Sequence, residues 1–283
     1  PYAEARPRLA GKHVSFSRRS RSTNEGVVSR ATKEEFLTLR TAVRVPSELL
    51  ERILELAGID MILVGGQALA FWGAYYHTPA PAIAVTKDVD LLGTKADVER
   101  LAHGLDAKAV FPHRINTTML VGQVLKDLPG GNYINIDVLF RVYGNVATEA
   151  IASRAVLAEN PAGRFRVMHP IDVLQGRLEN VYGLSAKQDE HGMAQLRLAI
   201  DIARTFVGDI ASQEATGADD SARPVVLRHL ARLETLALSD AGRKVAKRFG
   251  VHVADAIDPG PARHIESFVT KKLPQLLKLK KQG

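Results

Sequence analysis

The sequence predicts an α/β fold with a mixed β-sheet at its core, followed by a mainly helical C-terminal domain. Short apolar runs and one alternating segment, bounded by glycine and proline, occur before residue 150 and are typical of strands. From about residue 147 onward apolar residues recur at helical spacing. We therefore divide the chain into a basic N-terminal arm with a short helix (1–44), an α/β core (45–150) and a helical C-terminal domain (151–283).

Composition limits the class of protein. With 283 residues and 46% hydrophobic content, the chain can bury a sizeable core. No apolar run approaches the roughly 18 residues of a membrane-spanning helix, so we expect no membrane partner. The chain has no cysteine, which excludes disulfides, thiolate metal sites and thiol nucleophiles and is compatible with the cytoplasmic location that we expect.

The formal net charge of +7 suits a polyanionic partner such as nucleic acid, but so moderate an excess is more often ordinary solvated lysine and arginine. The charge gathers at the ends. Residues 1–50 carry ten Lys or Arg against five Glu, and residues 267–283 carry five lysines and no acid. Such ends are either phosphate-binding arms or soluble tails.

Two helices are predicted before the first strand. Thr32 and Glu35 have the spacing of a capping box that opens a short helix. A second helix begins with Ser47 as its cap and ends at Gly58. Its apolar stripe consists of Leu50, Ile53, Leu54 and Ala57.

A strand, a glycine turn and a helix follow. Met61–Val64 is a continuous apolar run, as in a strand covered on both faces. Gly65 and Gly66 allow close approach of a ligand to the backbone, and Gln67–Ala74 is predicted as a helix. The unpaired N–H groups at such a helix start suit a phosphate, although most glycine pairs are only turns.

The next strand is predicted over Val85–Leu92, with Asp88 and Asp90 on one face. Two carboxylates aimed at one point suit a divalent metal ion, whereas an isolated Asp-x-Asp is more often turn chemistry or a solvated edge. Thr94 and Asp97 are predicted to cap a helix that runs to about Leu105.

A third acid follows on a later strand. After a predicted strand over 114–125 and a turn at 129–131, Tyr133–Phe140 alternates sharply. Ile134, Ile136, Val138 and Phe140 share the apolar face, and Tyr133, Asn135 and Asp137 share the polar face. Asp137 is therefore expected to face the same cleft as Asp88 and Asp90.

The second half is predicted to be mainly helical. Arg164–Met168 adds a strand, and Pro170 starts a helix on whose packed side Arg177 needs an anionic partner. The remaining elements are a helix over 189–207, a linker over 212–222, and helices over 224–238, 240–249 and 261–279.

Joined in order, these residues resemble the DNA polymerase beta-type nucleotidyltransferase superfamily, whose signature is a strand, Gly-Gly or Gly-Ser opening a helix, Asp-x-Asp on the next strand and a later third acid. The similarity is closer to bacterial abortive-infection and toxin–antitoxin type nucleotidyltransferase-like proteins. Their core reads GGxAL and then Thr-x-Asp-[Ile/Val]-Asp-Leu, as Gly65–Leu69 and Thr86–Leu91 do. The resemblance covers about residues 45–207 and implies a mixed-sheet nucleotidyltransferase core.

The resemblance also implies roles for individual residues. Asp88, Asp90 and Asp137 would be catalytic and would bind two Mg²⁺ ions, with Mn²⁺ as an alternative. The nucleotide would be bound by Gly65, Gly66, Gln67, Lys87, Arg177 and Lys187. The chain departs from the pattern in two places, because Gly66 replaces a frequent serine and Arg177 replaces a usual lysine. Taken singly, Arg177 is more often a structural ion pair and Lys187 plain surface.

The function implied is transfer of a nucleoside monophosphate from a nucleoside triphosphate to an acceptor hydroxyl on RNA, tRNA or protein, with the chain acting as a toxin beside a cognate antitoxin. A second hypothesis is an inactive protein of the same fold that binds a toxin or antitoxin partner or RNA. A third is a small-molecule nucleotidyltransferase of the antibiotic-modifying kind.

Overall fold

In the computed structural model the described residues are 41–81, 84, 86–112, 118–144, 146–161, 163–215, 224–263 and 265–282. The helix predicted after Thr32, and most of the basic N-terminal arm, lie outside them.

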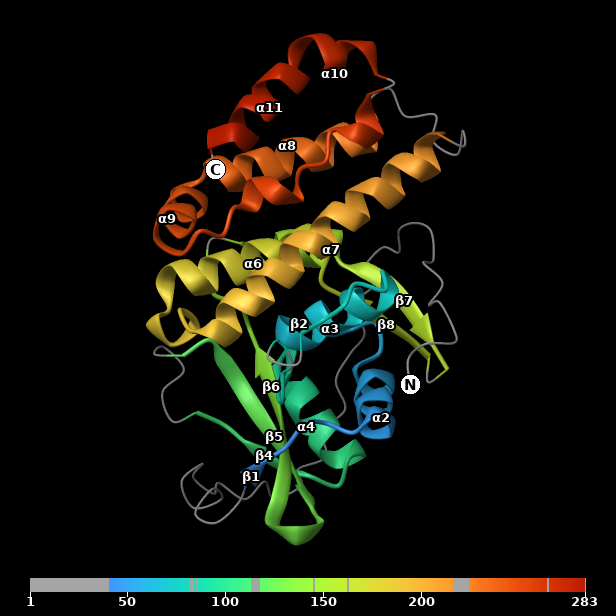
Figure 1. Ribbon diagram of the computed structural model, residues 1–283. Helices are drawn as coiled ribbons and strands as arrows, with labels where there is room; N and C mark the ends of the chain where they lie inside the picture. The colour runs from blue at the N-terminus through green and yellow to red at the C-terminus, as the bar shows by residue number, and fades with distance from the viewer. Residues whose placement is uncertain are drawn as a thin grey trace.

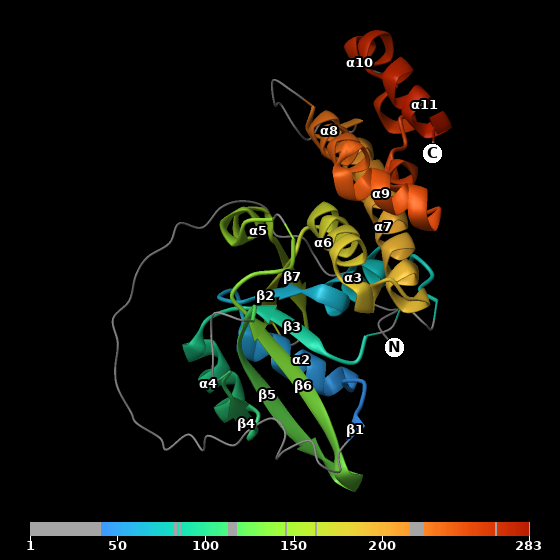
Figure 2. The ribbon, with the colours of Figure 1, turned by 90° about the vertical axis from the view of Figure 1, so that its left-hand side faces the viewer.

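The described strands form one mixed sheet, which confirms the predicted α/β fold (Figures 1 and 2). The strand order is β4-β5-β6-β3-β2-β8-β7, with β1 beside β6. The β3–β6, β2–β8 and β1–β6 pairs are parallel, and the others are antiparallel. The strands are β1 (Thr41–Ala42), β2 (Ile62–Val64), β3 (Val89–Leu92), β4 (Lys108–Val110), β5 (Leu120–Leu128), β6 (Asn132–Leu139), β7 (Val156–Asn160) and β8 (Gly163–Val167).

The described helices pack on this sheet and continue beyond it. The α-helices are α2 (Ser47–Ala57), α3 (Gly65–Tyr75), α4 (Lys95–Gly104), α5 (Thr148–Arg154), α6 (Pro170–Gly183), α7 (Glu190–Ala215), α8 (Val225–Leu238), α9 (Asp240–Phe249), α10 (Glu266–Lys271) and α11 (Leu273–Gln282). Short 3₁₀ turns are η3 (Pro129–Gly131), η4 (Ser185–Lys187), η5 (Val253–Ala256) and η6 (Gly260–Ala262). None of the helices in the described ranges is long and apolar enough to cross a membrane.

Local signals account for several elements. The helix α2 buries Ile53, Leu54 and Ala57 and ends at Gly58, as predicted. Its N-cap is Pro46, however, and Ser47 is its first residue, so the predicted serine cap is wrong. The predicted capping box of α4 is confirmed, since the Thr94 N–H donates to Asp97 Oδ2 at 2.8 Å.

The strand that carries the Asp-x-Asp motif is shorter than predicted. It begins at Val89, so Asp88 precedes the strand in a bend. The antiparallel partner β2 reaches only to Val64, opposite Asp90, because the chain turns into α3 at Gly65. Residues before Val89 therefore have no partner on that side to hold them in a ladder.

Other boundaries also differ. Sequence reasoning does not predict β4 or β7. The strand β4 pairs with β5, which overlaps the predicted strand over 114–125, and β7 pairs with β8, which was predicted over Arg164–Met168. The predicted helix over 261–279 is divided into η6, α10 and α11. Phe140 lies beyond the end of β6 and is 41% exposed, rather than continuing the apolar face. The β7–β8 hairpin joins the sheet at β2, past residue 150, and the division into domains stays a prediction.

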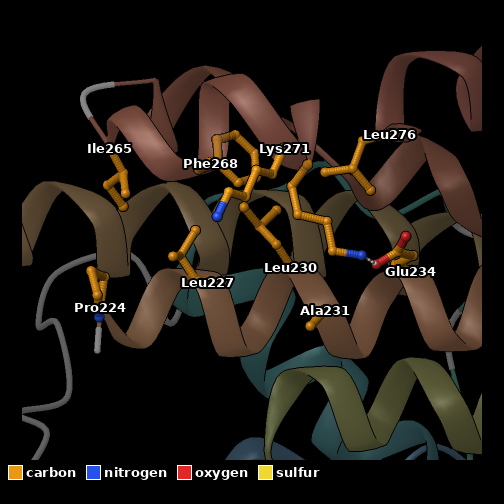
Figure 3. A pocket seen from close by; sticks show the side chains of 10 residues that line it. Pro224, Leu227, Leu230, Ala231, Glu234, Ile265, Phe268, Lys271 and Leu276 are labelled. Atoms are coloured by element: carbon orange, nitrogen blue, oxygen red, sulfur yellow. Dashed lines mark hydrogen bonds and ion pairs between the residues drawn. The ribbon is translucent and has the colours of Figure 1, made fainter. Parts of the chain in front are cut away.

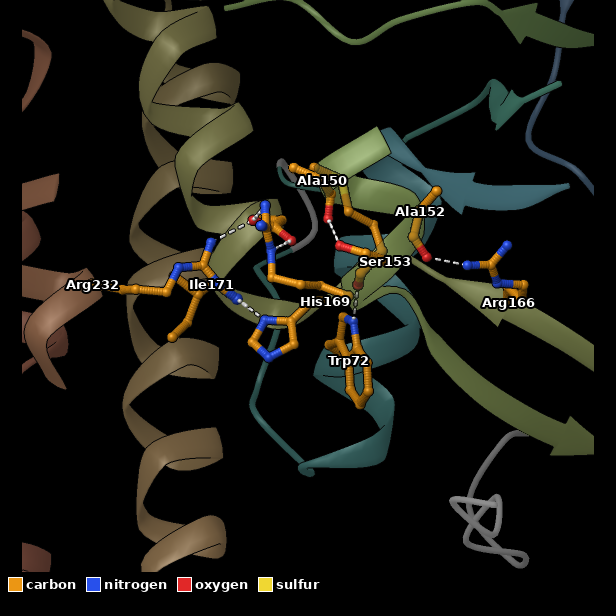
Figure 4. A network of polar contacts seen from close by, with 11 residues as sticks. Trp72, Ala150, Ala152, Ser153, Arg166, His169, Ile171 and Arg232 are labelled. Atoms are coloured by element: carbon orange, nitrogen blue, oxygen red, sulfur yellow. Dashed lines mark hydrogen bonds and ion pairs between the residues drawn. The ribbon is translucent and has the colours of Figure 1, made fainter. Parts of the chain in front are cut away.

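A buried polar network fastens the helices to the sheet (Figure 4). Asp172, in the first turn of α6, is fully buried. It accepts two hydrogen bonds from Arg154 of α5, both at 2.9 Å, and one from Arg232 of α8 at 2.5 Å. Nearby, the Trp72 indole of α3 donates to the carbonyl of Met168 at 2.8 Å. One carboxylate thus joins three helices that are distant in sequence.

Candidate functional site

Two of the predicted carboxylates lie side by side on neighbouring strands. Asp90 on β3 is directly opposite Asp137 on the parallel strand β6. Residues opposite each other in a parallel pair point to the same face of the sheet, so the two carboxylates share one face. Asp88 joins them through Asn135, whose Nδ2 donates to Asp137 Oδ1 at 2.9 Å and to Asp88 Oδ1 at 3.5 Å.

Two amide side chains that sequence reasoning did not assign complete this cluster. Asn135 and Asp137 are two residues apart on β6, so their side chains point to the same face of the sheet. This spacing could have identified Asn135 as a site residue. Gln123 pairs with Asp137 across β5 and β6, and its Nε2 donates to Asp137 Oδ1 at 2.6 Å and to Asn135 Oδ1 at 3.1 Å. No local pattern marks Gln123, because it reaches the site through strand pairing.

The glycine turn borders the carboxylates directly. Gly65 has φ +64°, a left-handed conformation that favours glycine, and a Cβ there would lie 1.9 Å from Asp90 Oδ2. The N–H of Gly66 donates to Asp90, and a Cβ at Gly66 would lie 2.6 Å from the Thr86 Cβ. Close packing therefore requires glycine at both positions, against Asp90 at Gly65 and against Thr86 at Gly66.

The cluster holds uncompensated negative charge. Burial, with the neighbouring Asp137 and Asp88 carboxylates, raises the pKa of Asp90 to about 6. Arg177 and the Gly66 N–H oppose this rise. Ionisation of Asp90 therefore costs free energy in this environment, and a cation bound beside the carboxylate would lower that cost.

Arg177 of α6 faces this charge, in agreement with the predicted inward arginine. Its Nη1 donates to Gln195 Oε1 at 2.8 Å, and Gln195 Nε2 donates to the carbonyl of Ala84 at 3.2 Å. The residue is half-buried, but its Nε is fully buried and has no hydrogen-bond partner among the described residues. Burial lowers the pKa of Arg177, and Asp90 raises it. The guanidinium therefore keeps an unused donor near Asp90.

The other predicted nucleotide-binding residues are placed differently. Gln67 is buried in the first turn of α3. Lys87 is exposed in the bend before β3, next to Asp88. Lys187 ends η4, beyond the C-terminal end of α6, and is not among the groups that shift the pKa of Asp90. The structure brings Arg177 to the carboxylates and shows no such interaction for Lys187.

The donor set suits a hard divalent cation, which binds oxygen ligands. Three carboxylates and the amide oxygens of Asn135 and Gln123 supply such ligands. Within the described ranges, however, no three His, Cys, Asp or Glu side chains are gathered as a preformed metal centre. Asn135 lies between Asp88 and Asp137, and its amide N–H groups satisfy the oxygens that a metal ion would use. These amides would have to move or turn for a metal ion to bridge the carboxylates.

A hollow of about 350 Å³ lies elsewhere, between α8 and the α10–α11 pair (Figure 3). Leu227, Leu230 and Phe268 contribute to its apolar lining. Its one acidic group, Glu234, is paired with Lys272 at 2.6 Å. This hollow lacks the convergent polar groups that chemistry on a phosphate requires, so the carboxylate cluster is the candidate site.

Comparison of the chain with protein-family models, with curated proteins and with solved structures gave no significant match.

Proposed function

We propose that this chain is a Mg²⁺-dependent nucleotidyltransferase of the DNA polymerase beta type. The observation that carries the proposal is the pairing of Asp90 with Asp137 on adjacent parallel strands, beside the positive-φ turn that opens α3. This arrangement sets carboxylates next to a helix N-terminus, so that cation ligands and backbone donors for phosphate meet at one place.

The reaction is in-line displacement at the α-phosphorus of a nucleoside triphosphate. The acceptor oxygen forms a bond to that phosphorus, the bond to the bridging oxygen of the β-phosphate breaks, and pyrophosphate leaves. Asp137 accepts the proton of the acceptor hydroxyl. Bound Mg²⁺, held by Asp88, Asp90 and Asp137, supplies neutralisation of the charge that develops on the phosphoryl oxygens.

Other groups position the triphosphate. In this proposal the N-terminal turn of α3 binds the outer phosphates, with its positive dipole end and with N–H groups other than that of Gly66, which donates to Asp90. Arg177 offsets the charge of Asp90, and in this proposal it also offsets the charge of the phosphates. Lys87 and Lys187 are assigned to the phosphates by the same proposal. The acceptor is RNA, with tRNA to be tested first, or protein, and the chain acts as a toxin that a cognate antitoxin restrains.

The test incubates the protein with each labelled nucleoside triphosphate, Mg²⁺ or Mn²⁺, and either total RNA or total protein. We expect metal-dependent label on one acceptor class and none with the Asp88→Asn, Asp90→Asn double variant. The Asp60→Asn, Asp201→Asn variant removes two exposed carboxylates and should label as the native protein does. Equal labelling by the native protein and the Asp88, Asp90 variant would refute the enzyme.

One observation favours a second candidate, a protein of this fold that only binds a partner. Asn135 and Gln123 already satisfy the oxygens of Asp88 and Asp137 without a metal ion. Calorimetry distinguishes the two, since the enzyme binds a nonhydrolysable triphosphate more tightly with Mg²⁺, whereas a pure binding protein shows no such coupling.

A further inference from the structure

A row of aromatic rings, each with a cation close to it, extends from the end of β6 to α9. The rings belong to residues on three separate segments of the chain. The pairs are Arg141 with Phe140 at 5.4 Å, Lys244 with Tyr182 at 5.4 Å and Arg248 with Phe249 at 4.8 Å, each measured to the ring centroid. We call these six residues the aromatic–basic track.

The three parts of the track are in contact with one another. The turn after β6 packs on the last turns of α6, since a Cβ at Gly183 would lie 2.2 Å from the Tyr143 hydroxyl. The Tyr182 hydroxyl donates to Asp240 Oδ2 at 2.7 Å and lies 3.3 Å from Lys244 Nζ. Figure 1 shows α9 above the left-hand ends of α6 and α7. The turn after β6, the end of α6 and the start of α9 are therefore neighbours in the fold.

The helix α9 gives the track its charge. Four exposed cations, Arg243, Lys244, Lys247 and Arg248, lie on α9 against one acid, Asp240. Asp240 is already paired with Lys244 at 2.8 Å. The net excess of three positive charges on ten residues is not neutralised within the helix (4 − 1).

The other end of the track follows the strand β6, which carries Asp137, along the chain. Phe140 follows Asp137 by three residues, which corresponds to roughly 10 Å along an extended chain. Phe140 is 41% exposed, and Arg141 beside it is also exposed. The Arg141 guanidinium lies over the Phe140 ring, so this end of the track presents a cation and a partly exposed aromatic ring together.

We propose that the aromatic–basic track binds a single-stranded polynucleotide, with its phosphates on the α9 cations and a base stacked near Phe140. Single strands are bound by cations that follow the backbone and by aromatic rings on which unpaired bases stack. A duplex hides the base faces, and an acidic protein segment would match the cations of α9 but offers no base to stack on Phe140. The inference rests on the proposed function and deepens it, because such a strand would be the acceptor of the proposed transfer.

Binding is measured by fluorescence anisotropy with a labelled single-stranded RNA and the DNA of the same sequence, without nucleotide or Mg²⁺. We expect the double variant Lys247→Gln, Arg248→Gln to bind the strand about tenfold more weakly. The slope of the logarithm of the binding constant against the logarithm of the salt concentration should fall by the equivalent of about one to two phosphate contacts. The matched control Lys271→Gln, Lys278→Gln removes the same charge from α10 and α11 and should bind as the native protein does. Tighter binding of the RNA or of the DNA identifies which of the two polynucleotides the track binds.

Phe140→Ala tests the stacking separately. It should weaken binding of the single strand about tenfold and leave binding of an abasic strand unchanged. The proposal is overturned if the α9 variant and Phe140→Ala bind like the native protein, if the control loses as much as the α9 variant, or if a duplex binds as tightly as the single strand.

These outcomes are separable from the proposed function. Strand binding without any nucleotidyl transfer would support the track and refute the enzyme. Transfer of label to protein, with no binding of either strand, would refute the track and leave the enzyme standing.

Discussion

At the scale of single residues, Asp90 has the most unusual environment in the candidate site. It combines burial, two neighbouring carboxylates and contact with the backbone of the glycine turn. Its pKa of about 6 lies well above that of a free aspartate, near 3.9. The carboxylate is still mainly ionised at neutral pH, so the cost of its charge is present in the metal-free protein.

This cost predicts a pH dependence of stability. Because the folded pKa of Asp90 is raised, its contribution to stability is fully present below about pH 4 and is lost as the pH rises through about 6. Asp90→Asn removes the charge, so its free energy of unfolding minus that of the native protein should grow from near zero at pH 4 to about 2 kcal/mol at pH 7. Urea denaturation with a chelator present measures this difference.

The control for this prediction is Asp60→Asn, which replaces a carboxylate whose side chain is 74% exposed. Its free energy of unfolding should stay within about 0.5 kcal/mol of that of the native protein at both pH values, as for most surface substitutions. A constant difference for Asp90→Asn as well would show that the environment of Asp90 does not oppose its charge.

At the scale of elements, the junction of β2 with α3 determines the site. The Gly65 turn ends β2, starts α3 and leaves room for the Asp90 side chain of β3. A side chain at Gly65 would meet both a conformational penalty and a collision, since the added Cβ overlaps Asp90 Oδ2.

Gly65→Ala is therefore expected to lower stability by about 3 kcal/mol and to abolish nucleotidyl transfer, because the Asp90 carboxylate must move. Gly250→Ala is a matched control, since Gly250 has φ +63° and nothing lies within 4 Å of its added Cβ. The control should lose only about 1 kcal/mol and keep full activity. Equal losses of stability in the two variants, measured by thermal unfolding, would contradict the predicted collision.

At the scale of the whole molecule, Asp172 of α6 joins that helix to α5 and α8. The side chains of Arg154 and Arg232 are 34% and 29% exposed, whereas Asp172 is 0% exposed. Removing the carboxylate would leave two partly buried guanidinium groups facing each other without an anion.

Asp172→Ala should therefore lower the free energy of unfolding by about 3 kcal/mol. Asp201→Ala breaks a surface ion pair with Arg204 at 3.6 Å and should cost under about 0.5 kcal/mol. Urea denaturation measures both. A small loss for Asp172→Ala would mean that apolar packing, rather than this network, holds α5, α6 and α8 together.

The sequence by itself determined the elements whose signals are local. The spacing of apolar residues and the glycines predicted α2, β2 and α3, and the strict alternation predicted β6. The same local reasoning identified Asp90, Asp137 and Arg177 as candidates, because each stands at a recognisable position in a strand or helix.

The tertiary structure decided which of these residues meet. Pairing between distant segments decides three features of the site. It sets Asp90 opposite Asp137, it begins β3 only after Asp88, and it places Gln123 of β5 beside Asp137. Helical and strand periodicities specify which face a residue occupies but carry no information about the partner of that face. For that reason the sequence predicted a cluster of acids, and only the fold joined Asp88 to it through Asn135.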